Sequence, residues 1–102
     1  MHDAAARIDA RSAPRDEVSH RARALGPDGR PLALLVVNVS PGGLMARCDG
    51  EHATGDRLRV HLPGLGPMAA EVRWALGGRI GCRFDRPVSL ARYYQLLAAM
   101  RA

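Results

Sequence analysis

Aromatic residues are scarce in this chain: phenylalanine, tryptophan and tyrosine make up 4% of its 102 residues. A hydrophobic core must therefore be built mainly from leucine, valine, alanine and methionine. Barrels that bind single-stranded nucleic acid stack the bases on exposed aromatic side chains. That class of protein is thus a less favoured interpretation of the chain, although salt-sensitive binding to any oligonucleotide would restore it.

Cysteine is also rare, and Cys48 and Cys82 are too far apart in sequence to form a paired-cysteine motif. The four histidines add no spacing typical of a metal site, so we expect no metal and no cofactor. A reduced, cytoplasmic chain is the simplest interpretation of this cysteine usage. The sequence also lacks a Ser–His–acid grouping and a suitable carboxylate pair, so we expect no enzyme activity.

Long apolar runs are absent as well. No window of about 18 apolar residues predicts a membrane span. Met1–Ala10 contains no apolar stretch of the kind found in signal peptides. The length suits one small domain and leaves no room for a separate catalytic or DNA-binding domain. We therefore expect any signal carried by the chain to act on another protein.

Positive charge, by contrast, is plentiful. The formal net charge is +5, and most of it comes from arginine. The planar guanidinium fits phosphate groups and the guanine edge, and it stacks on rings. A small arginine-rich domain indicates an anionic partner, which could be nucleic acid, a nucleotide or an acidic protein surface. A basic surface that is merely solvated explains the charge equally well.

Short segments divided by turn residues predict strands from about residue 17 onward. Alternation is clear where Ala70, Val72, Trp74 and Leu76 are expected to share one face of a strand, with Trp74 in the core. Gly77-Gly78 then predicts a tight hairpin turn. The six predicted strands are Glu17–Leu25, Leu32–Val39, Gly43–Cys48, Arg57–Leu62, Ala69–Leu76 and Arg79–Phe84.

The expected fold is all-β with a C-terminal helix, and residues 16–102 are expected to form a six-stranded antiparallel barrel. Closing the sheet removes its exposed edges. Ser89 is placed to cap a helix over about residues 89–101. Residues 1–15 show no clean period and are expected to form a flexible N-terminal arm. The helix should pack through one apolar stripe: Leu90, Tyr93, Tyr94, Leu97 and Met100.

Two arginines in the predicted arm, Arg11 and Arg15, form an RxxxR motif. Each guanidinium can hold a pair of phosphate oxygens or the O6/N7 edge of guanine, so the two together can clamp a compact dianion. The spacing by itself is weak, because Arg7 and Arg11 repeat it and a solvated basic arm explains it too.

A polar loop, Asn38-Val-Ser-Pro-Gly-Gly43, ends the second predicted strand. Asn38 and Ser40 carry short hydrogen-bonding side chains that suit turns. Gly42 and Gly43 are expected to allow positive φ and a close approach of the backbone to a ligand, such as the edge of a base. An ordinary turn between strands explains the same residues when they are taken alone.

Together, the RxxxR arm, the next two strands and the [DN]xSxxG loop resemble the PilZ domain family, over about residues 11–97. Several motifs in the right order make the resemblance specific. It implies a six-stranded antiparallel barrel with a C-terminal helix that binds the bacterial second messenger cyclic di-GMP, often as an intercalated pair. Later features also match the family: Leu44, Gly55-Asp56, Val72-Arg-Trp74 and Gly81-Cys-Arg-Phe84.

The resemblance also implies site residues. The two RxxxR arginines are expected to contact phosphates and guanine rings, and the loop to hold another guanine. Binding would pin the arm against the barrel and so signal to a partner protein. A PilZ-type adaptor that senses no nucleotide, for example in pilus assembly or motility, stays open as the alternative. The implied ligand-binding residues are Arg11, Arg15, Asn38, Ser40 and Gly43, with Arg7, His20 and Gly42 as further candidates.

Overall fold

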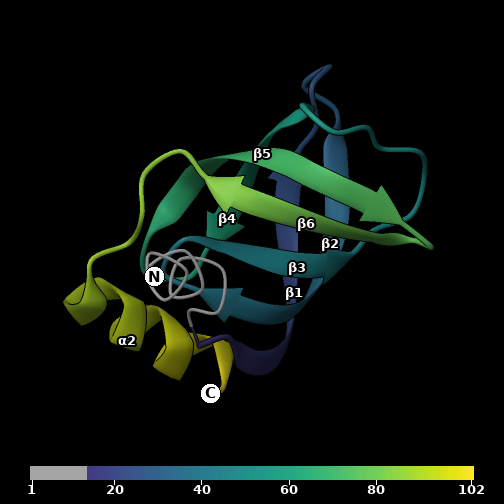
Figure 1. Ribbon diagram of the computed structural model, residues 1–102. Coiled ribbons are helices and arrows are strands. Elements are labelled where there is room, and N and C mark those ends of the chain that lie inside the picture. The colour runs from purple at the N-terminus through teal and green to yellow at the C-terminus, as the bar shows by residue number, and fades with distance from the viewer. Residues whose placement is uncertain (1–13) are drawn as a thin grey trace, which may run out of the picture.

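The computed structural model describes residues 14–102, which contain six strands followed by one helix (Figure 1). The predicted all-β barrel with a C-terminal helix is confirmed, and each predicted strand is present with ends shifted by three residues or fewer. The elements are β1 (Asp16–Leu25), β2 (Pro31–Ser40), β3 (Gly43–Arg47), β4 (Arg57–Leu62), β5 (Gly66–Leu76), β6 (Arg79–Phe84) and α2 (Leu90–Met100).

The six strands form a closed antiparallel barrel in the order β1-β2-β3-β6-β5-β4. Tight turns join several neighbours, and the β5–β6 turn is the predicted Gly77-Gly78 pair. Both glycines have positive φ, 61° and 78°, the geometry that a two-residue hairpin turn requires. The barrel closes through only two β1–β4 pairs, Ala24 with Val60 and Leu25 with Arg59.

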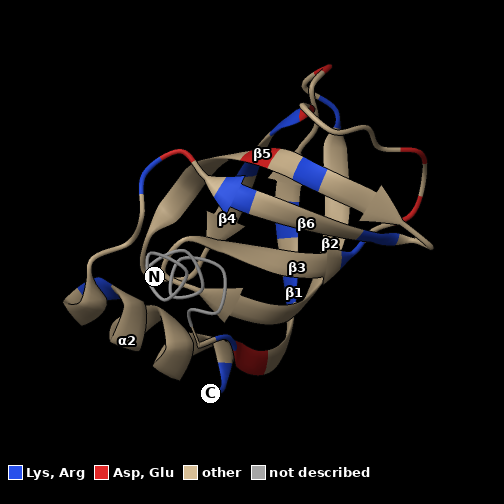
Figure 2. Ribbon diagram, viewed as in Figure 1, with Lys and Arg blue, Asp and Glu red and all other residues tan. Residues whose placement is uncertain are grey.

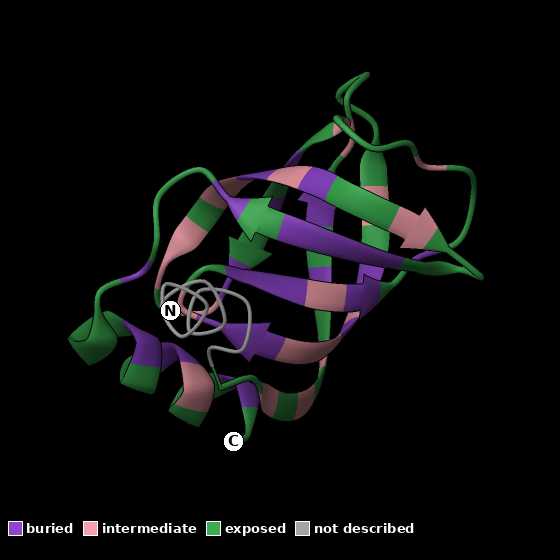
Figure 3. Ribbon diagram, in the orientation of Figure 1, coloured by how far each residue is buried: buried purple, intermediate pink, exposed green. Residues whose placement is uncertain are grey.

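Alternate residues of each strand point into the barrel and form one hydrophobic core (Figure 3). Its members are mostly valine, leucine and alanine, as the scarcity of aromatic residues predicts. The largest side chains that are almost completely buried are Leu44, Ile80, Leu96, Val36, Val39, Val60 and Val72.

One strand departs from simple alternation. The β5–β6 register shifts between Val72 and Trp74, which is the mark of a β-bulge. Beyond the bulge, Ala75 packs against the core, whereas Trp74 and Leu76 are 37% and 80% exposed. The prediction that Trp74 packs in the core is therefore wrong, because one extra residue turns the end of the strand over.

Helix α2 covers one end of the barrel (Figure 1) and starts where predicted. The Ser89 side chain accepts a hydrogen bond from the Arg92 backbone N–H at 3.4 Å. The buried face consists of Tyr93, Leu96 and Met100, so the predicted stripe is partly wrong: Leu90 and Tyr94 are each 62% exposed. Within residues 14–102, no helix has the length and apolar character needed to cross a membrane.

Polar contacts join α2 to the beginning of β1. The Tyr93 hydroxyl lies 2.5 Å from the Asp16 carboxylate and 2.9 Å from the Val39 carbonyl, and it can donate its proton to either. Burial and the neighbouring Asp16 raise the pKa of Tyr93, so this hydroxyl stays protonated and remains a donor. Arg101 donates to the Glu17 carbonyl at 2.7 Å. These contacts fix the backbone directly after Arg15.

Candidate functional site

A groove of about 940 Å³ runs across the outer surface of the barrel and contains several of the predicted site residues. A volume of this order suits a small-molecule ligand. Backbone of β3 and β6 lies along it, and the loop after β6 closes one end. The lining residues are Arg15, Ser40, Gly42, Gly43, Arg57, Glu71, Arg73, Trp74, Gly81, Cys82, Arg83, Phe84, Asp85 and Pro87.

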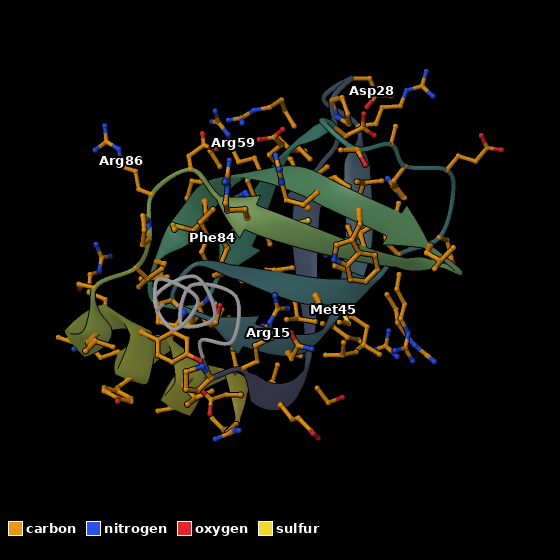
Figure 4. All side chains as sticks on the ribbon, in the orientation of Figure 1. Arg15, Asp28, Met45, Arg59, Phe84 and Arg86 are labelled. Carbon is orange, nitrogen blue, oxygen red and sulfur yellow. The ribbon has the colours of Figure 1, made fainter. Side chains whose placement is uncertain are left out.

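Arg15 is held at the groove by Asn38. Its Nη1 donates to Asn38 Oδ1 at 3.2 Å, and the Asn38 amide nitrogen points to Met45 Sδ at 3.7 Å. Arg15 and Met45 are labelled in Figure 4. The amide carbonyl thus orients the guanidinium but leaves its positive charge in place, whereas an aspartate would neutralise that charge. Arg7 and Arg11 lie outside the described residues.

The turn between β2 and β3 is hydrogen-bonded to the end of β6 and to the loop after β6. The Gly42 carbonyl accepts a hydrogen bond from the Phe84 N–H at 2.9 Å, and the Pro41 carbonyl accepts one from the Val88 N–H at 2.8 Å. Ser40 is 7% exposed and pairs with Gly43 across the turn. These contacts fix the backbone of the turn, of which Ser40, Gly42 and Gly43 line the groove.

Gly42 and Gly43 do not have the positive φ that the sequence predicts. Gly43 is required for a different reason: a Cβ there would lie 2.1 Å from the Cys82 carbonyl oxygen on β6. A Cβ on Gly42 meets nothing within 4 Å. Gly43 thus lets two paired strands approach closely, and the groove floor at this point is bare backbone.

The charges around the groove are mixed but leave Arg15 available. Arg57 pairs with Asp85, and this hydrogen bond lowers the pKa of the Asp85 carboxyl. Glu71 lies 3.5 Å from Arg73 and 3.9 Å from Arg83. Within residues 14–102, Arg15 has no carboxylate within ion-pair distance. The groove therefore contains four arginines and two acids, which favours an anion (Figure 2).

Trp74 is a groove residue that the sequence reasoning placed in the core. Its indole lies over Gly81, where a Cβ would come within 2.0 Å of Nε1. The absence of a side chain at Gly81 leaves the space that the indole occupies, and Trp74 lines the groove with 37% of its surface exposed. The pairing of a tryptophan with a glycine on the next strand is the only sequence signal of this arrangement.

Two other residues bear on the site: His20, a further ligand-binding candidate, is not in the groove, and Cys82 does not act as a nucleophile. His20 lies in a separate groove with His61, between β1 and the β4–β5 turn. Cys82 lines the candidate groove, but burial raises the pKa of its thiol to about 12, so the nucleophilic thiolate is not formed near neutral pH. The arginine guanidiniums, the backbone at Gly43 and the Trp74 indole are groups suited to non-covalent contacts with a ligand.

Fold and groove together describe a small β-barrel domain with a basic surface groove that contains one exposed indole. The family model of the PilZ domain matches residues 9–100, and the chain belongs to this family of cyclic di-GMP receptors. PilZ domains are binding domains rather than enzymes.

One solved structure supports the same fold. The structure described as the crystal structure of the PilZ domain of CeSA from a cellulose synthesizing bacterium matches with a TM-score of 0.61 at 14% sequence identity. The match covers 85% of this chain and 94% of that one. A search of curated proteins found no match.

Proposed function

We propose that the chain binds cyclic di-GMP in the groove between Arg15 and Trp74. The observation that carries the proposal is that one groove brings together Arg15, Ser40, Gly43 and an exposed indole. Arg15 binds a phosphate or a guanine edge through its guanidinium fork. The turn residues hydrogen-bond a guanine, and the bare backbone at Gly43 allows the base to approach closely.

The proposed signal is a change in the order of the N-terminal arm. Arg11, which lies outside the described residues, binds the same ligand as Arg15 and so attaches residues 1–15 to the barrel. The contacts of Tyr93 and Arg101 with Asp16 and Glu17 support the coupling, because they give the arm a fixed starting point on β1. The altered surface then acts on a partner protein.

Isothermal titration of the full chain tests the ligand assignment. We expect binding of cyclic di-GMP in preference to GTP and cyclic GMP, because only the dinucleotide offers two phosphates and two guanines. Hydrogen exchange of the same samples should show ligand-dependent protection around Arg11–Arg15 and little change in β4. A flat titration with folded protein would rule out the proposed ligand, and an arm equally protected without ligand would rule out the ordering.

Replacing Trp74 with alanine should weaken cyclic di-GMP binding by about 1–3 kcal/mol, the range for stacking of a base on an aromatic ring. The melting temperature should also fall, because the indole is only 37% exposed and covers Gly81, so affinity is measured at a temperature where the variant is fully folded. Trp74 is the single tryptophan of the chain, so its fluorescence in the native protein reports the groove directly and should be quenched by ligand. Leu76→Ala on the same exposed strand end is the matched control.

If saturating ligand leaves the tryptophan fluorescence unchanged, and Trp74→Ala binds with wild-type affinity, Trp74 is not part of the site. Binding of cyclic di-GMP itself would remain established by the titration.

A further inference from the structure

A second basic surface crosses the barrel on the side of the β5–β6 turn. Strand pairing places Arg21 opposite Leu35, Leu35 opposite Arg47, and Arg47 opposite Arg79, which in turn pairs with Leu76. Directly paired residues of antiparallel strands point to the same face. These five residues form one row across β1, β2, β3, β6 and β5, called the arginine row below (Figure 1).

All three arginines of the arginine row are exposed, and so is Arg23, the next outward-facing arginine on β1. Within residues 14–102, none of the four has an ion pair. Arg47 and Arg79 stand directly opposite each other, an arrangement of like charges that destabilises a sheet. An anion bound between the two arginines removes this repulsion.

The arginine row borders a cavity of about 590 Å³. Arg21, Arg23 and Arg47 line it, together with Asp49 and the Gly77-Gly78 turn. Asp49 is the acidic residue of this lining, and three arginines outweigh its charge. The cavity is separate from the groove of Arg15 and Trp74, with which it shares no lining residue.

The shape and composition of the row distinguish between classes of anion. Measured along the curved surface of the barrel, five neighbouring strands span about 19 Å, which is too long for a single phosphate to reach all three arginines of the row. The row contains no aromatic side chain on which bases could stack, whereas it includes Leu35 and, at its end, Leu76, which is 80% exposed. Arginines interspersed with apolar side chains are typical of protein interfaces.

We propose that the arginine row is a docking surface for an acidic segment of a protein partner, one that carries carboxylates and apolar side chains on the same face. The carboxylates pair with Arg21, Arg47 and Arg79, and the apolar side chains cover Leu35 and Leu76. The inference does not depend on nucleotide binding, and its test uses protein free of cyclic di-GMP. A failure here therefore leaves the titration result untouched.

The test is fluorescence anisotropy with a labelled synthetic peptide of Glu-Glu-Val-Val repeats, at near-physiological salt. In an extended peptide this repeat places glutamate and valine alternately along each face. The wild-type chain should bind it, and the Arg47→Gln/Arg79→Gln variant should bind at least about tenfold more weakly, as expected for lost charge-assisted hydrogen bonds. This variant should melt at the same temperature or higher, because it loses a like-charge pair. A peptide with lysine in place of glutamate should not bind.

Arg30→Gln/Arg92→Gln is the matched control, since it removes the same charge from exposed positions elsewhere. It should bind the acidic peptide like the wild-type chain. Equal weakening in the control would show binding to net charge alone and overturn the proposal, as would no binding by the wild-type chain. A further outcome is that the wild-type chain binds a single-stranded oligonucleotide as tightly as the peptide, with the Arg47→Gln/Arg79→Gln variant losing both. That result would overturn the proposal and assign the surface to nucleic acid.

Discussion

Gly43→Val should unfold or severely destabilise the barrel and abolish ligand binding with it. The new Cβ would lie 2.1 Å from the Cys82 carbonyl oxygen, and both atoms belong to strands that pair directly. Backbone cannot move aside like a flexible side chain, so the β3–β6 seam must open. We expect a loss of about 3 kcal/mol or more, which lowers the melting temperature of a domain of this size by roughly 12–24 °C.

Gly42→Val is the matched control, because Gly42 has ordinary φ and open space around its Cβ position. Its melting temperature, followed by circular dichroism, should stay within a few degrees of the wild-type value. A Gly43→Val protein as stable as Gly42→Val would show that the close approach of β3 and β6 does not hold in solution.

Arg15→Ala should weaken cyclic di-GMP binding by about 1.5–3 kcal/mol, the scale of a hydrogen bond to a charged group. That range corresponds to roughly 10–150-fold in the dissociation constant. The melting temperature should barely change, because the contact of Arg15 with Asn38 is exposed to solvent. Titration calorimetry on both proteins measures the first effect, and thermal denaturation measures the second.

Two comparisons make the arginine experiment specific. Arg92→Ala removes an exposed arginine from α2 and should leave affinity unchanged. Arg11→Ala should match Arg15→Ala, whereas Arg7→Ala should do much less, since Arg7 lies one step further from β1. If Arg7→Ala proves more damaging than Arg15→Ala, the ligand uses the other RxxxR register and Arg15 has another role.

The barrel could be predicted from the sequence because its signals are local. Alternation marks β4 and β6, and a Gly-Gly pair forces the hairpin between β5 and β6. The loop motif also led to Ser40 and Gly43, which the structure places in one groove with Arg15. Whether these residues bind the ligand stays a prediction.

Tertiary structure alone decided the residues whose position depends on the register of a paired strand or on the docking of the helix. The bulge in β5 turned Trp74 outward, and the strict alternation of its neighbours gave no sign of that extra residue. Leu96 and Tyr94 both fit an apolar helical stripe, so the sequence does not distinguish them. Packing against the end of the barrel buries Leu96 and leaves Tyr94 exposed.

The reason is the difference between local and non-local interactions. Hydrophobic period and turn chemistry depend on residues a few positions apart, so the sequence by itself determined the strands, the turns and the capped helix. Register and bulges are set by how whole strands pair, and several of these pairs join strands far apart in the chain. Only that pairing brought Arg21, Arg47 and Arg79 into one row, and placed the Cys82 carbonyl where a side chain on Gly43 would have to be.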